Sequence, residues 1–114
     1  MSHLIDRDQL IGDNYQLPIS LILVHSDPGT GRGMHRDPCP EVFVIESGRA
    51  TFRVDNTELV GEAGQIVIAP ANAYHGFTNT GSGELCLTAI HTAPAFSTEW
   101  LADPDAGWVT SRGG

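Results

Sequence analysis

The sequence predicts a small all-β protein, either a sandwich or a barrel built from short strands. Thirteen Gly and seven Pro interrupt the 114 residues, and no segment between them could hold a long amphipathic helix. The remaining segments are rich in Val, Ile, Leu, Phe and Thr, which favour strands. Short strands at regular intervals are typical of sandwiches and barrels. The predicted strands are residues 19–26, 41–47, 50–55, 65–69, 74–78 and 84–92.

Alternation along two of these strands places polar side chains beside apolar ones. Residues two apart on a strand share a face, so Glu41 lies with Phe43, and His75 lies with Phe77. Phe43, like Phe52, is expected in the core. A carboxylate on an apolar face needs a partner, because burying an unpaired charge is costly. For Glu41 the partner is either a metal ion or an Arg, and we favour the metal ion.

The chain is long enough for one domain and too short for a second core. We expect an N-terminal arm over residues 1–18, a β-domain over 19–94, and a short helix with a tail over 95–114. The helix is expected within residues 96–101, beginning from Ser97 and ending before Pro104. Trp100, within this segment, is expected to be a core residue.

Charge excludes several classes of partner. Six basic residues, all of them Arg, stand against fourteen acidic residues, which gives a net charge of -8. No basic stripe is present that could neutralise phosphates, so we expect neither nucleic acid nor a membrane surface as a partner. The lack of Lys also excludes Schiff-base chemistry.

The first residues and the cysteines suggest a cytoplasmic protein. The start carries charges where a signal peptide would be apolar, and no apolar run is long enough to span a bilayer. Cys39 and Cys86 show no spacing typical of a disulfide framework, so we expect both to be reduced thiols.

Two remote segments carry the side chains that bind divalent transition metals. His35, Asp37 and Glu41 fall within seven residues, and His75 lies on a separate apolar segment. Imidazole nitrogens and carboxylate oxygens are the donors that such ions take. Two readings of Asp37 stay open, a ligand or a turn residue before Pro38.

The spacing of these residues matches two sequence motifs, and through them the chain resembles single-domain cupins. The first motif has Gly, His, a second His, Glu and Gly at set intervals, and those positions hold Gly29, His35, Asp37, Glu41 and Gly48. The second has Gly, Pro, Gly, His and Asn, and its positions hold Gly64, Pro70, Asn72, His75 and Asn79. Each motif carries one substitution, Asp37 for His and Asn72 for Gly. Asn tolerates the left-handed backbone of that glycine, so the fold should survive.

This resemblance implies an antiparallel jelly-roll barrel with a divalent metal near one open end. The implied ligands are His35, Glu41 and His75, with Asp37 where the family has a His. The metal is Mn, Fe, Ni, Co or Zn, and two carboxylates shift the preference toward the harder ions. Glu41 is also the candidate for proton transfer. Because cupins are habitually dimeric, we expect a homodimer, with Trp108 packing on the partner.

Further residues are candidates for lining a pocket beside this site. Cys39 lies between two of the expected ligands, as a rim residue or as a soft fifth ligand. His91 shares a strand face with Leu87 and Ala89 and is expected to face the interior or be structural. The full set of pocket candidates is His25, Cys39, Phe43, Tyr74, Phe77 and His91.

Three functions fit this sequence. The first is a metal-dependent enzyme acting on a small organic molecule, with an oxygenase favoured over an isomerase, cyclase or decarboxylase. The second is a non-catalytic module that binds a sugar or another small molecule. The third, placed last, is an iron oxygenase using 2-oxoglutarate, because no basic residue lies between Arg53 and Arg112 to hold that cosubstrate.

Overall fold

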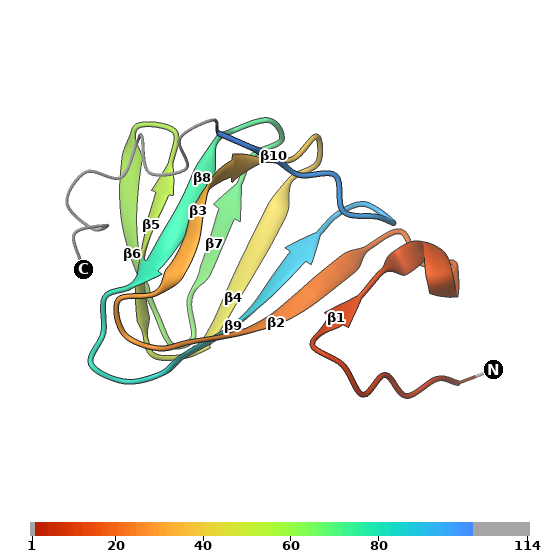
Figure 1. The fold of residues 1–114 in the computed structure, drawn as a ribbon, viewed down its shortest axis with the longest axis horizontal. Helices are drawn as coiled ribbons and strands as arrows, with labels where there is room; N and C mark the ends of the chain where they lie inside the picture. Colours follow the sequence, from red (N-terminus) through yellow and green to blue (C-terminus); the bar gives the residue numbers. More distant parts are fainter. Residues whose placement is uncertain (1, 102–114) are drawn as a thin grey trace.

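The computed structural model describes residues 2–101 and contains two antiparallel five-stranded sheets that face each other (Figure 1). One sheet has the order β1-β2-β9-β4-β7, and the other has the order β10-β3-β8-β5-β6. The prediction of an all-β jelly-roll barrel is therefore confirmed. The elements are β1 (Gln9–Leu10), the 3-10 turn η1 (Gly12–Tyr15), β2 (Ser20–Ser26), β3 (Gly31–Arg36), β4 (Glu41–Ser47), β5 (Arg49–Val54), β6 (Thr57–Glu62), β7 (Ile66–Ala69), β8 (His75–Asn79), β9 (Leu85–His91) and β10 (Glu99–Trp100).

The six predicted strands correspond to β2, β4, β5, β7, β8 and β9, and the sequence did not reveal β3 or β6. Strand β3 contains two Gly and two Arg, and β6 contains two Glu, so neither has the composition of a strand. Both form because a neighbour pairs with them, β8 with β3 and β5 with β6. Pairing partners override local propensity in such strands.

The helix expected within residues 96–101 is absent, and the strand β10 takes its place. Glu99 and Trp100 pair with Arg36 and His35 of β3, and the backbone N–H of Leu101 donates to Met34. A six-residue helix is too short to offset the cost of its nucleus, whereas the edge of β3 offers ready hydrogen-bond partners. Trp100 was also wrongly expected in the core, since 49% of its surface is exposed. Trp108 lies outside the described residues.

The apolar core fills the space between the sheets. Burial alternates along β4 and β9, so every second side chain points inward. The rings of Phe43, Phe52 and Phe77 pack with centroids 5.1 to 6.0 Å apart, which confirms the core positions predicted for Phe43 and Phe52. Phe43 also reaches His75, with 5.8 Å between ring centroids, so the core ends where the polar cluster begins.

Two turns of the chain adopt a left-handed backbone. Asp55 has φ of 51° in the hairpin between β5 and β6, and Asn72 has φ of 67°, as expected for a replaced glycine. Gly48, with φ of 91°, lies against the backbone of Glu84, where a Cβ would come within 2.7 Å of the carbonyl oxygen. This turn therefore needs glycine.

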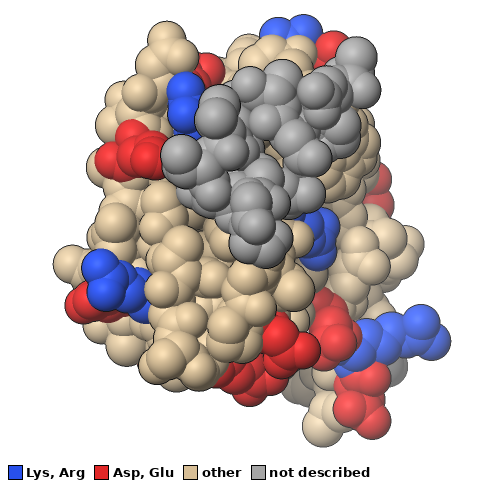
Figure 2. Space-filling view, turned by 60° about the vertical axis from the view of Figure 1, so that its left-hand side comes forward, with Lys and Arg blue, Asp and Glu red and all other residues tan. Residues whose placement is uncertain are grey.

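The outward face of the β1-β2-β9-β4-β7 sheet carries two cross-strand rows of mostly aliphatic side chains. Register and alternation define them. The first row is Leu21, Ile90, Val42 and Ile68, and the second is Leu23, Thr88, Val44 and Ile66. The outermost pair, Ile66 and Ile68, is about 60% exposed. On the face drawn in Figure 2, acidic and basic side chains lie together in several mixed groups, with uncharged surface between them. Among residues 2–101, no helix has the length and apolar character to cross a membrane.

Candidate metal centre

Strand pairing brings the four expected ligands together inside the barrel. His35 on β3 and His75 on β8 are cross-strand partners, Asp37 directly follows β3, and Glu41 begins β4. All four side chains are buried, and one donor atom from each lies within 4.8 Å of the others. The fold thus assembles His35, Asp37, Glu41 and His75 into one cluster, as the motif spacing implied.

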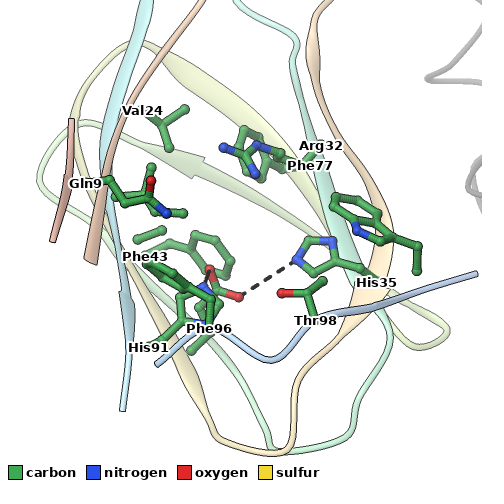
Figure 3. Close-up of a pocket in the computed structure, with 13 residues that line it drawn as sticks. Gln9, Val24, Arg32, His35, Phe43, Phe77, His91, Phe96 and Thr98 are labelled. Atoms are coloured by element: carbon green, nitrogen blue, oxygen red, sulfur yellow. Dashed lines mark ion pairs between the residues drawn. The ribbon is translucent and has the colours of Figure 1, made fainter. Parts of the chain in front are cut away.

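The Glu41 carboxylate lies at the centre of this cluster. Its Oε1 is 2.7 Å from Nε2 of His75 and 3.9 Å from Nε2 of His35, the contact dashed in Figure 3. Its Oε2 is 3.1 Å from Nε2 of His91, which is the cross-strand partner of Glu41 on β9. Imidazoles from three strands therefore converge on one carboxylate.

This cluster of contacts shifts the pKa of both Glu41 and His75, the pair in closest contact. Burial alone would raise the pKa of Glu41, but the hydrogen bond from His75 and the nearby imidazoles of His35 and His91 outweigh it and hold that pKa well below its usual range. Burial alone would lower the pKa of His75, but its bonds to Glu41 and to the Ala73 carbonyl raise it. When no metal is bound, each shift favours the charged form of its residue, the Glu41 carboxylate and the His75 imidazolium.

Backbone carbonyls orient both imidazoles for metal binding. Nδ1–H of His35 donates to the Gly33 carbonyl at 2.8 Å, and Nδ1–H of His75 donates to the Ala73 carbonyl at 2.9 Å. A carbonyl can only accept, so Nε2 of each ring is left to face Glu41. Such outer hydrogen bonds fix the tautomer of metal-binding histidines.

Asp37 presents a buried carboxylate oxygen that no donor satisfies. Its Oδ1 accepts a 2.7 Å hydrogen bond from the Thr98 hydroxyl. Within residues 2–101 its Oδ2 has no hydrogen-bond partner, and it lies 3.7 Å from Nε2 of His75. Leaving such an oxygen unpaired is costly, and a cation between it and the imidazoles would remove that cost. Two imidazoles and two carboxylates fit a divalent transition ion and balance its charge.

A cavity of about 230 Å³ opens beside the cluster. Figure 3 shows His35 and His91 on opposite walls of it, with Phe43 between them and Arg32 farther along. Apolar side chains form most of its lining, which is Gln9, Ile22, Val24, Arg32, His35, Glu41, Phe43, Phe77, Ala89, His91, Phe96, Thr98 and Trp100.

Three of the six pocket candidates line this cavity, namely Phe43, Phe77 and His91. The other three do not, because their side chains lie elsewhere. His25 is exposed on the outward face of β2, and Tyr74 lies under the Arg36 guanidinium, 4.9 Å from its ring centroid. Cys39 is half-buried outside the cavity, where burial and the nearby Asp37 raise the pKa of its thiol.

The sequence did not identify several residues that shape the site. Arg32 lines the cavity from β3, a strand that the composition of the sequence did not predict. Thr98, which directly precedes β10, and Trp100 on β10 reach the site, with the Trp100 ring 4.7 Å from the His35 ring. The alternation of β9 did place His91 inward, but only the register between β4 and β9 reveals its contact with Glu41.

Comparison with known proteins agrees with this geometry. The family profile described as the cupin domain matches residues 22–91, most of the chain. The chain belongs to the cupin family. A search of curated proteins finds no match for this cupin.

Solved structures share the fold at low sequence identity. Oxalate decarboxylase from Bacillus subtilis is 22% identical with a TM-score of 0.73, over 79% of this chain and 26% of that chain. A cupin-like protein from Thermotoga maritima is 21% identical with a TM-score of 0.73, over 82% of this chain and 72% of that one. This cupin thus spans about a quarter of the oxalate decarboxylase but most of the cupin-like protein.

Proposed function

We propose that this cupin is a metal-dependent enzyme acting on a small organic acid. One observation supports it above the others, the four buried donor groups within 4.8 Å of one another at the edge of a cavity. A closed structural metal site would not need an adjoining cavity, whereas a catalytic site needs an open position for substrate. The proposed ion is Mn, Fe, Co, Ni or Zn.

The proposed ligands are His35, Asp37, Glu41 and His75. When bound, the ion would act as a Lewis acid that polarises a carbonyl or carboxylate of the substrate. Glu41 and His91 would hold or move a proton, since Nε2 of His91 contacts Oε2 of Glu41 and the imidazole lines the cavity. Phe96 packs edge-on against His91, with centroids 4.7 Å apart, and helps to exclude water.

The cavity favours a substrate with a carboxylate and a small apolar part. Arg32 is the one cationic side chain in its lining among the described residues, and a guanidinium pairs readily with carboxylates. Phe43, Phe77 and Ala89 give the cavity its apolar walls. A volume of about 230 Å³ suits a compact acid better than a sugar chain.

For the reaction type we retain the oxygenase among the possibilities. The test is turnover of small carboxylic acids by metal-loaded protein with and without dioxygen. Loss of turnover under anaerobic conditions is the expected result, and undiminished anaerobic turnover would contradict the oxygenase. Tight carboxylate binding that persists after metal removal, without any turnover, would instead favour the non-catalytic binding module.

We also propose that this cupin is a homodimer joined through the two aliphatic rows. The rows span four strands about 4.8 Å apart and about three residues of about 3.3 Å each, roughly 200 Å² of face. That is smaller than the largest apolar patches on monomers. A second copy is the occupant we propose, because an identical sheet has the same twist and its rows would cover these ones symmetrically. Two such faces bury less area than a stable specific interface, so the dimer should dissociate on dilution. A cytoplasmic location, the absence of nucleic-acid and membrane partners, and the domain boundaries given above stay predictions.

A further inference from the structure

A second group of metal-binding side chains lies on the outward face of the same sheet. His25 on β2 and Cys86 on β9 are cross-strand partners, and Glu84 immediately precedes β9. His25 and Glu84 are exposed, and Cys86 is half-buried. None of the three belongs to the interior cluster or lines its cavity.

The three donor atoms already stand at metal-bridging distances. Nδ1 of His25 is 3.3 Å from Sγ of Cys86, and that sulfur is 3.5 Å from Oε1 of Glu84. In a tetrahedral zinc site, bond lengths of about 2.0 to 2.3 Å place neighbouring ligand atoms about 3.5 Å apart. The side chains could therefore enclose an ion with little movement.

The backbone beneath this group is held in place by the core. The residues before His25 and after Cys86 along their strands, Val24 and Leu87, are cross-strand partners and both are buried. A site on paired strands is positioned more accurately than one on loops. Exposure of His25 and Glu84 leaves a path for the ion and room for a water as the fourth ligand.

We propose that His25, Glu84 and Cys86 bind a thiophilic divalent ion such as Zn²⁺. The thiolate, the imidazole and the carboxylate are the three protein ligands that zinc takes most often. The thiolate also separates this site from the interior one, whose four donors are nitrogen and oxygen only. Soft sulfur ligands select zinc-like ions over Mg²⁺ or Mn²⁺.

Cobalt substitution tests this proposal directly on the full chain. Co²⁺ bound by a thiolate gives a near-ultraviolet charge-transfer band, and Co²⁺ bound by nitrogen and oxygen alone does not. Titration of the reduced parent protein with Co²⁺ should produce this band, and Zn²⁺ should remove it by competition. The band should vanish in Cys86→Ser. In His25→Ala, the apparent affinity of the protein for Co²⁺ should fall at least tenfold.

The matched control is Cys39→Ser, which removes the other thiol, the one beside Asp37 and Glu41. The band should persist unchanged in this variant. The proposal is overturned if the parent shows no band, if the band survives in Cys86→Ser, or if it disappears in Cys39→Ser. Because His25 is exposed, His25→Ala should fold like the parent. It therefore still tests the site if Cys86→Ser folds poorly. The four donors of the interior cluster are nitrogen and oxygen only, and Cys39→Ser tests whether Cys39 adds a sulfur ligand there.

Discussion

The inner and outer faces of the β1-β2-β9-β4-β7 sheet have similar compositions and opposite surroundings. Each is largely aliphatic, and each ends in a cluster of metal-binding side chains. On the inner face, packing against the other sheet leaves Leu87 only 2% exposed and Glu41 only 3% exposed. On the outer face, Leu23 and Ile68 are 40% and 60% exposed. Alternation decides which residues share a face, but what packs on that face decides its energetics.

The largest difference should appear between two leucines of this sheet. Leu87 is 2% exposed, so Leu87→Ala should lower the free energy of unfolding by about 2 to 5 kcal/mol through lost burial and a residual cavity. Its matched control on the outer face, Leu23→Ala, should cost less than about 1 kcal/mol. Urea denaturation of the metal-free variants measures both values. Equal losses of unfolding free energy in Leu87→Ala and Leu23→Ala would contradict this difference between the two faces.

Removing the central carboxylate should have the next largest effect. Glu41→Gln leaves the buried His75 without its charged partner, and breaking a buried pair costs about 3 to 5 kcal/mol. The same variant should lose the metal ion of the interior cluster, while the outer group of His25, Glu84 and Cys86 is unchanged. The outer-face control is Glu84→Gln, which should leave the unfolding free energy unchanged within about 0.5 kcal/mol. Equal free energies of unfolding for Glu41→Gln and Glu84→Gln would contradict the central position given to Glu41.

The pH dependence of the metal-free protein should report the inner pair. The pKa of Glu41 is lowered on folding, so its stabilisation is present above its unfolded pKa of about 4.3 and is lost as the pH falls toward the folded value. The pKa of His75 is raised, so its stabilisation is present below about pH 6.5 and is lost as the pH rises through the folded value. The melting temperature should therefore be highest between about pH 4.5 and 6.5. A melting temperature that keeps rising above pH 7 without metal would contradict this pairing.

A smaller effect is expected from the hydroxyl that orients Asp37. Thr98→Val removes the donor to Oδ1 and should weaken metal binding by about tenfold, as outer-sphere substitutions do. Thr98→Ser keeps the hydroxyl and should bind almost as tightly as the parent. Isothermal titration with one divalent metal compares the three proteins. Equal affinity for all of them would mean that Asp37 needs no orientation from Thr98.

The smallest effect on folding, and a large one on association, is expected at the outermost aliphatic residue. Ile68→Asp places a charge in the first aliphatic row and should shift the protein to a monomer while leaving the melting temperature within a few degrees of the parent. The control is Glu58→Asp on β6, outside the rows, which should behave like the parent. Sedimentation velocity over a range of concentrations measures the effect. A parent protein that is monomeric at all concentrations would contradict the dimer.

The sequence predicted the metal cluster better than its surroundings, for a physical reason. The ligands lie in motifs whose spacing fixes them relative to Gly29, Gly48 and Gly64, which all adopt positive φ. The contact of His91 with Glu41 depends instead on the register of β4 against β9, which no local pattern encodes. Trp100 was misplaced because its backbone pairs with β3, a strand whose Gly and Arg content hides it.

The central claim is that the interior cluster binds one divalent transition ion. Elemental analysis of untagged protein, purified without added chelator, tests it most directly against His75→Ala, with His25→Ala as the outer-face control. We expect His75→Ala to contain about one transition ion fewer than the parent, and His25→Ala to keep the ion of the interior cluster. Equal metal content in parent and His75→Ala, or a parent that binds no ion even after incubation with Mn²⁺, Fe²⁺, Co²⁺, Ni²⁺ or Zn²⁺, would contradict it.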